Sequence, residues 1–234
     1  MSRTVAVVQA RLGSQRFPEK TLALLGEKSL IEWVVTRVRR STLVDRIVVA
    51  TTRETTDDRL VAECERLGVE VRRGPTDDLL RRFIEALEGD AADVVVRVCA
   101  DNPLIDPECI DWAIVEYRQH GVDYAFNHRP FRECNYADGF GAEVVSRDVL
   151  ERLNGMELSA SHREHVTLAV VDGTLVVRRH ACVAPIQLAH PELRFDVDTP
   201  ADLAALQALV DGNALTIDAT AQEFVSAAQQ RGLR

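Results

Sequence analysis

The stretch Thr4–Val8, with the sequence TVAVV, predicts a short buried β-strand, because every residue in it is apolar or β-branched. The polar loop Gln9–Lys20 follows it, and Ser29 then opens a helix. Ser29 and Glu32 have the S-x-x-E spacing of a capping box. Apolar side chains recur on one face of this helix, at Ile31, Val34, Val35 and Val38. The chain thus begins with a strand, a loop and a helix.

The same alternation continues through three further predicted strands, at Arg46–Ala50, Val69–Arg72 and Asp93–Val98. Helices are predicted between them, at Asp57–Leu67, which Gly68 ends, and after a cap at Thr76, where apolar residues share a face (Leu80, Phe83, Ile84, Leu87). Near-continuous apolar strands alternating with helices indicate an α/β fold, a mostly parallel, twisted sheet with helices on both faces. Ligands bind beyond the carboxyl ends of such strands, which points to the loops Gln9–Lys20 and Ala100–Pro107.

The second half of the sequence is less regular. Strands are expected at Val122–Phe126, Ala142–Val145, Thr174–Arg178 and Leu193–Val197, a helix around Ser161–Val171, and another from Thr199 and Pro200. No linker, repeat or low-complexity tract is visible. We therefore expect a single domain over residues 1–234, with an insertion around 127–190 that serves substrate choice or dimerisation.

Composition narrows the class of protein. The chain has 234 residues, 46% hydrophobic and 28% charged, which is too apolar for disorder. Its formal net charge of −9 argues against nucleic acid as a partner, although local cations can still bind a small anion. No apolar run is long enough for a membrane span, and the first residues become polar too early for a signal peptide, so a cytoplasmic protein is expected. Its five cysteines, with no C-x-x-C, predict free thiols.

The loop Gln9–Lys20 has the composition of an anion site. Gly13 permits close approach of backbone N–H groups, Ser14 adds a hydroxyl, and three cations stand nearby (Arg11, Arg16, Lys20). Lys20 and Lys28 are the only lysines in the chain. The spacing matches neither the P-loop nor the dinucleotide motif. The loop therefore predicts a polyphosphate site, with a solvated basic turn as the alternative.

A more specific pattern, A-R-x-G-S-x-R-x-P-x-K, runs from Ala10 to Lys20. It resembles the signature loop of the sugar-activating cytidylyltransferases, which include the enzymes making CMP-linked sialic and ulosonic acids and, closest by eye, the spore-coat polysaccharide branch. Cousins in natural-product pathways act on small phosphonates. The resemblance continues in order over residues 4–210, through RG at 73–74, DDLL at 77–80, RVCADNPLIDP at 97–107, DG at 138–139, EV at 143–144, HREHV at 162–166 and FDVDTPADL at 195–203.

The resemblance implies a nucleotide-diphospho-sugar transferase architecture, which is GT-A-like and Rossmann-like. It implies an enzyme that transfers CMP from CTP to a small acidic acceptor and releases pyrophosphate. Lys20, Arg11 and Asp101 would be catalytic. The nucleotide-binding residues would be Ala10, Arg11, Leu12, Gly13, Ser14, Arg16, Lys20, Thr51, Thr52, Asp77, Arg97 and Ala100. The choice of cytosine rests on the resemblance alone.

Carboxylates supply a candidate metal site. Asp101 follows a predicted strand, and Asp196 and Asp198 lie two apart at the end of another, on one face. Carboxylate and phosphate oxygens suit Mg²⁺. In the resembled family Asp101 and Asp198 match the ligand positions, with Asp196 a weaker candidate. The alternatives are a structural turn for Asp101 and an acidic helix flank for Asp198.

Acceptor-binding candidates come from the second half of the chain. They are Asn127, Arg129, Tyr136, Glu143, His162, Arg163 and His165. His162 and His165 could pair on a metal, but no further ligand is spaced to complete a zinc site, so acceptor contact or core hydrogen bonding is favoured. Phe140, Gly141 and Ala142 stand where the sugar-acid branch would have larger or more polar residues, which mildly favours a phosphonate acceptor.

Two other classes compete with this interpretation. A GT-A glycosyltransferase shares the sheet and an acidic metal motif but would lack the loop pattern and would release a nucleoside diphosphate. A non-catalytic nucleotide-binding regulator would never release pyrophosphate. The resemblance also favours a homodimer.

Overall fold

The computed structural model describes residues 3–128 and 134–232. A seven-stranded sheet organises it, in the order β5-β4-β1-β6-β8-β7-β9. The strands are β1 Thr4–Gln9, β4 Arg46–Thr52, β5 Glu70–Gly74, β6 Val94–Cys99, β7 Tyr124–Phe126, β8 Glu143–Ser146 and β9 Arg179–Ala181. Every pairing is parallel except those that β8 makes with β6 and β7. The mostly parallel sheet predicted from the apolar strands is confirmed.

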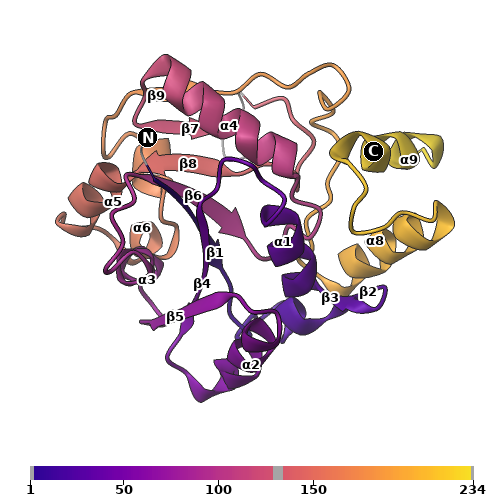
Figure 1. Ribbon diagram of the computed structural model, residues 1–234, viewed down its shortest axis with the longest axis horizontal. Helices are drawn as coiled ribbons and strands as arrows, with labels where there is room; N and C mark the ends of the chain where they lie inside the picture. The colour runs from indigo at the N-terminus through magenta and orange to yellow at the C-terminus, as the bar shows by residue number, and fades with distance from the viewer. Residues whose placement is uncertain (1–2, 129–133, 233–234) are drawn as a thin grey trace.

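Helices cover both faces of the sheet (Figure 1). On one face lie α1 Leu30–Val38, α2 Asp58–Arg66 and α4 Pro107–His120; on the other lie α3 Leu79–Ala86, α5 Arg147–Asn154 and the short α6 Ala160–Glu164 and α7 Leu168–Val171. The valines of β1 and β6 are fully or almost fully buried between these layers. None of the helices in the described ranges is long and apolar enough to cross a membrane.

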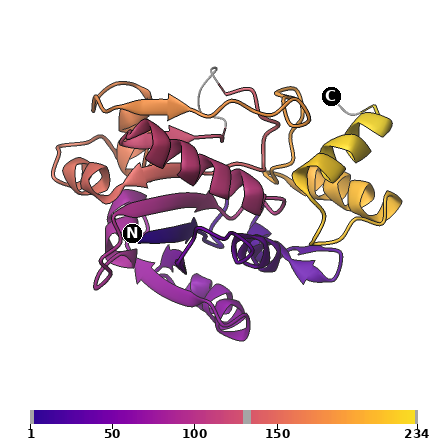
Figure 2. The ribbon, with the colours of Figure 1, turned by 45° about the horizontal axis from the view of Figure 1, so that its top comes forward.

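The C-terminal helices lie beside the sheet rather than over it. Figure 2 shows α8 Pro200–Gly212 and α9 Ala221–Gln230 next to the small hairpin of β2 Leu24–Leu25 and β3 Lys28–Ser29. Thr199 and Asp202 form a capping box that starts α8, as the Thr199-Pro200 sequence predicts. Two 3-10 turns, Lys20–Leu22 and Thr55–Asp57, complete the elements that shape the loops after β1 and β4.

Three predictions for the second half of the sequence are wrong or misplaced, and three helices were missed. The predicted strand Thr174–Arg178 is displaced to β9, because its pairing with the three-residue β7 begins at Arg179. Leu193–Val197 makes only an isolated bridge from Arg194 to Asp138, so its alternating burial comes from neighbouring loops. The predicted helix Ser161–Val171 is broken into α6 and α7. The helices α4, α5 and α9 were not predicted.

Two predicted helix caps need correction as well. Asp78 caps α3, whereas the Thr76 hydroxyl donates a hydrogen bond to Glu54. Ser29 does cap α1 by accepting from the N–H of Glu32, but the Glu32 carboxylate binds Lys28 and Arg66 and closes no capping box. All five cysteines are free thiols, as predicted.

Candidate active site

The loop after β1 is organised by a buried acid that the sequence analysis did not single out. Asp57 accepts hydrogen bonds from the N–H of Leu12 at 2.8 Å, the Thr51 hydroxyl at 2.8 Å, and the hydroxyl and N–H of Thr52 at 2.5 and 3.1 Å. Burial by itself raises the pKa of the Asp57 carboxyl, but these hydrogen bonds outweigh it and lower the pKa. Asp57 thus fixes where the loop leaves the sheet.

Lys20 and two carboxylates meet at the carboxyl edge of the sheet. The Lys20 Nζ lies 3.3 Å from both Asp101 and Asp198 and donates to the carbonyl of Val197 at 2.7 Å. Arg16 binds Asp198 through two parallel hydrogen bonds of 2.9 and 3.0 Å. Three segments far apart in sequence are therefore joined by charge at one point.

These groups line a cleft of about 730 Å³. Of the sequence-predicted residues, it brings together Ala10, Arg11, Gly13, Ser14, Arg16, Lys20, Asp77, Ala100, Asp101, His165 and Asp198. It also includes residues that were not predicted, namely Gln9, Gln15, Thr21, Leu79, Arg82 and Glu164. The cleft has the position that the parallel sheet requires, beyond the ends of β1 and β6.

Two of the unpredicted lining residues carry charge. Glu164, from α6, binds Arg11 across the cleft at 2.8 Å. The buried guanidinium of Arg82 donates to the carbonyls of Pro75 and Thr76 at 3.0–3.1 Å. Burial and the charge of Arg11 lower the pKa of Arg82. The only sequence signal for Glu164 was its place between His162 and His165.

Asp101 and Asp198 fit a hard divalent cation. Both carboxylates are partly exposed to the cleft, with 36% and 24% of their side-chain surface accessible, and both face the same ammonium group. A cation that replaced Lys20 between them would find two anionic oxygen ligands, and substrate oxygens and water could complete its shell. Asp196 instead forms a forked ion pair with Arg194 at 2.6 and 3.0 Å.

Several predicted binding residues lie in the interior with protein partners. Arg97 is ion-paired with Glu143 and donates to Gln9 at 2.9 Å, while Tyr124 donates to Glu143 at 2.8 Å. Burial favours the neutral form of Glu143, but the charge of Arg97 outweighs it and lowers the pKa of Glu143. This pair joins β6 to β8 beneath the cleft.

Asn127 is held in the same way. Its Nδ2 donates to the carbonyl of Cys109 at 2.6 Å and its Oδ1 accepts from Ala142 at 2.8 Å. Leu12, Thr51 and Thr52 are also buried, around Asp57. Leu12, Thr51 and Thr52 therefore support the cleft's loop from behind, whereas Asn127 is held between Cys109 and Ala142, neither of which lines the cleft.

The remaining acceptor candidates are dispersed. The Tyr136 hydroxyl donates to Val183 at 3.4 Å, and its side chain lines a separate cavity of about 440 Å³. His162 binds Asp172 at 2.7 Å, which lowers the pKa of that carboxyl to about 2. Arg163 donates to Asn154 and to the Met156 carbonyl at 3.1 Å. His165 alone of these lines the cleft, and Arg129 falls outside the described residues.

The sheet order and the charged cleft define an α/β nucleotidyltransferase. The chain belongs to the cytidylyltransferase family, since the family model described as cytidylyltransferase matches residues 5–223. The resemblance drawn from the loop motif is thereby confirmed, together with the expectation of an enzyme of this family.

Individual relatives agree with this assignment. The spore coat polysaccharide biosynthesis protein SpsF of Bacillus subtilis is 32% identical, over 97% of this chain and 94% of its own. A 3-deoxy-manno-octulosonate cytidylyltransferase of Anaeromyxobacter is 39% identical, over 56% of this chain and 52% of its own. A cytidylyltransferase structure from Leptospira borgpetersenii superposes with a TM-score of 0.89, covering 99% of this chain and 96% of that one at 24% identity, and shows the same fold.

Proposed function

We propose that the protein transfers CMP from CTP to a small acidic sugar, an ulosonic or nonulosonic acid, with release of pyrophosphate and dependence on Mg²⁺. The observation that carries the proposal is the meeting of Lys20, Asp101 and Asp198 in the cleft. An acceptor oxygen attacks the α-phosphorus of CTP, and where that oxygen belongs to a hydroxyl its proton passes to Asp101 directly or through water. The bond from that phosphorus to the bridging oxygen breaks, and its electron pair leaves with pyrophosphate.

The cations of the loop have the arrangement that a triphosphate requires. Arg11, Arg16 and Lys20 all line the cleft, and Gly13 leaves open space at its Cα, with nothing within 4 Å of an added Cβ. Guanidinium forks and an ammonium group neutralise phosphate oxygens by charge-assisted hydrogen bonds. Positioning and charge neutralisation supply most of the catalysis of phosphoryl-type transfers, so no buried general base is needed.

Mg²⁺ would be held by Asp101 and Asp198. When bound, it supplies Lewis-acid stabilisation of the charge that develops on the phosphate oxygens. Arg16 and Lys20, which pair with these carboxylates, would then be free to turn to the triphosphate.

The acceptor side is best supported at α6. Glu164 and His165 line the cleft, whereas Tyr136, His162 and Arg163 have partners elsewhere. We therefore propose that part of the 127–190 segment closes the acceptor side. The unusual Phe140 and Gly141 are core residues, with Phe140 packed on Phe195 and Phe224. Their departure from the sugar-acid pattern thus carries no argument for a phosphonate.

The test is a coupled pyrophosphate assay with CTP, Mg²⁺ and a panel of ulosonic acids, nonulosonic acids and small phosphonates. ATP, GTP and UTP are controls. We expect release with CTP and a sugar acid only, and its loss in Asp101→Asn. Pyrophosphate release with a phosphonate and with no sugar acid would mean that the acceptor is a phosphonate. A nucleoside diphosphate product would indicate a glycosyltransferase. Binding of CTP with no release from any acceptor would contradict the proposal and leave a regulator.

We also propose that the protein is a homodimer. Trp112 and Val183 border one cavity and Ile186 lies three residues beyond Val183; these apolar residues are 46%, 71% and 79% exposed, and exposed apolar residues that gather in one region mark interfaces. Light scattering after size exclusion should give twice the 26.0 kDa of the chain, and Val183→Glu with Ile186→Glu should give the monomer mass. A monomer before substitution would contradict this proposal.

A further inference from the structure

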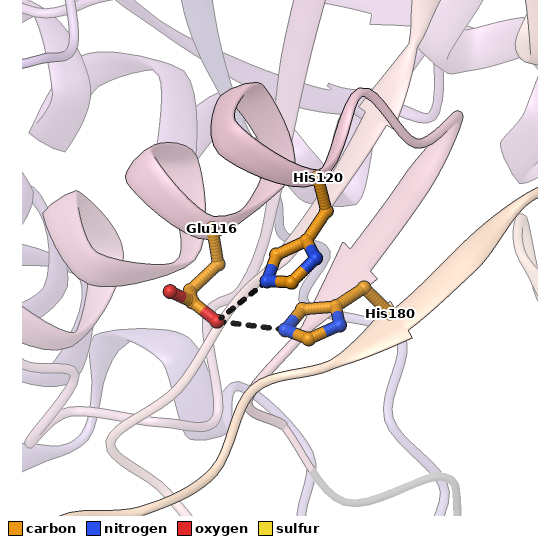
Figure 3. Close-up of side chains that lie close together, drawn as sticks. All are labelled: Glu116, His120 and His180. Carbon is orange, nitrogen blue, oxygen red and sulfur yellow. Dashed lines mark hydrogen bonds and ion pairs between the residues drawn. The ribbon is translucent and has the colours of Figure 1, made fainter.

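A second cluster of ligand-type side chains lies away from the cleft, between the C-terminal end of α4 and the edge strand β9 (Figure 3). Glu116 and His120 are one helical turn apart and face the same way. His180 points toward them from the middle of β9. None of the three lines the cleft described above.

The three ligand atoms converge. The Nε2 of His180 lies 2.7 Å and the Nε2 of His120 lies 3.6 Å from the same Glu116 oxygen, Oε2. All three atoms are within 4.8 Å of one another. The two imidazole rings are stacked, with centroids 3.8 Å apart and planes inclined by 19°. Both rings therefore present a nitrogen to one side of a single carboxylate.

The stack constrains the chemistry of the cluster. The stacked rings bring two imidazole nitrogens to the same carboxylate oxygen, and a ring nitrogen with a lone pair is a common metal ligand. Two imidazole nitrogens and one carboxylate oxygen are the ligands that zinc-like ions prefer, whereas Mg²⁺ and Ca²⁺ prefer oxygen alone. A purely structural ion pair would need only His180 and Glu116.

We propose that Glu116, His120 and His180 bind one divalent transition-metal ion of the zinc class. The three side chains supply three ligands, and His120, 49% exposed, leaves the fourth position open to water. The ion would join the end of α4 to β9, a three-residue strand that pairs only with β7 among the described strands. Because the ion would bind the folded chain and not the unfolded chain, it would stabilise this edge of the sheet.

The test uses untagged, full-length protein and Zn²⁺ or Co²⁺ alone, with Mg²⁺ as the comparison. Calorimetry should find one Zn²⁺ per chain, and bound Co²⁺ should show the absorption of a nitrogen- and oxygen-liganded ion. His120→Ala, His180→Ala and Glu116→Gln should each weaken Zn²⁺ binding by at least about tenfold, since even loss of an outer-shell partner costs about that much. Zn²⁺ should also raise the thermal midpoint, and His120→Ala should abolish the rise.

The matched control is His190→Ala, which removes an imidazole paired with Glu192 outside the cluster and should leave Zn²⁺ binding unchanged. His120 is half exposed, so its variant should fold even if His180→Ala does not. Absence of Zn²⁺ binding by the parent protein would overturn the proposal. So would binding that His120→Ala and Glu116→Gln leave intact, because the ion would then lie elsewhere, for example on Asp101 and Asp198.

Discussion

Lys20 is the residue on which the proposed chemistry depends most directly. Its ammonium group is compact, unlike the forked guanidinium of arginine, and it contacts two carboxylates and a carbonyl at once. In a chain whose cations are almost all arginines, this exception marks a place where shape as well as charge is required.

Lys20→Ala should lower pyrophosphate release about 100- to 1,000-fold, the usual cost of losing one transition-state donor. Lys20→Arg should not restore it, since a planar guanidinium differs in size and hydrogen-bond geometry from the compact ammonium group that is proposed to turn to the triphosphate. The assay of steady-state turnover checks this, and circular dichroism verifies folding. The control is Lys28→Ala, which removes the other lysine, a residue outside the cleft that pairs with Glu32. Turnover within threefold of the parent in Lys20→Ala would contradict the role.

Asp57 predicts a pH dependence of stability. Its folded pKa is lowered, so the stability that it contributes is fully present above its ordinary value of 3.8 and is lost as the pH falls through the folded pKa. Asp57→Ala should lower the free energy of unfolding by about 3 kcal/mol at pH 7, because it leaves the Leu12 N–H and the threonine hydroxyls without their acceptor.

Urea unfolding at a series of pH values measures this. The difference between parent and Asp57→Ala should shrink below about pH 4, as the parent's carboxylate becomes protonated. The exposed Asp218→Asn serves as the control and should change stability little at any pH. A difference that stays constant down to pH 2 would mean that the carboxylate charge is not what stabilises the loop.

Among the elements, the residues just before β8 pack very closely on those just after β7, at Gly141 and Asn127. A Cβ added to Gly141 would collide with the carbonyl group of Asn127, a residue whose side chain is held by hydrogen bonds to Cys109 and Ala142. Gly141→Ala should therefore lower the free energy of unfolding by about 3 kcal/mol, through overpacking.

Chemical denaturation of Gly141→Ala beside Gly155→Ala tests this. An added Cβ at Gly155 meets only ordinary contacts of 3.5 Å or more, so that variant should remain within about 0.5 kcal/mol of the parent. Equal stability of the two variants would show that the backbone at Asn127 moves away without cost.

The central parallel strands β1, β4 and β6 were predictable because each contains a continuous apolar run that is buried on both faces. The cleft's basic loop was predictable too, because its cations cluster in sequence. The hydrogen-bond partners of the individual side chains were not predictable. The sequence does not show whether a carboxylate such as Glu143 or Asp57 faces a substrate or a buried arginine or threonine. Leu193–Val197 was mistaken for a strand because alternating apolar and polar residues indicate only that every second side chain is buried, and an irregular segment can show the same pattern. Helix α4 did carry end signals, at Asp106, Pro107 and Gly121.

At the scale of the whole molecule, one buried arginine joins three helices. Arg37 of α1 donates to the carbonyls of Ile105, Ile217 and Ala219 at 2.6–2.7 Å. It also contacts Asp106, which caps α4 and accepts from the first N–H of α9. Burial lowers the pKa of Arg37 to about 10, so the guanidinium is still charged at neutral pH.

Arg37→Met should lower the free energy of unfolding by about 3–5 kcal/mol, because it leaves the buried Asp106 charge with fewer partners and removes a donor from three carbonyls, of which Ile217 keeps only Arg40 at 3.4 Å. The exposed Arg40→Met, three residues away, is the control. Equilibrium unfolding in urea measures both. If Arg37→Met were as stable as Arg40→Met, the C-terminal helices would be held by their apolar contacts instead.

The pairing of Arg16 and Lys20 with Asp101 and Asp198 has a thermodynamic consequence. In the proposed reaction the cations exchange carboxylates for phosphates. A nucleotide that bound alone would leave the carboxylates of Asp101 and Asp198 without a cation. A metal ion that bound alone would leave Arg16 and Lys20 without an anion. Binding of either ligand therefore favours binding of the other, and one coupling free energy describes the effect in both directions. Nucleotide affinity should rise with Mg²⁺ by the same factor by which Mg²⁺ affinity rises with nucleotide, making the two a cooperative pair.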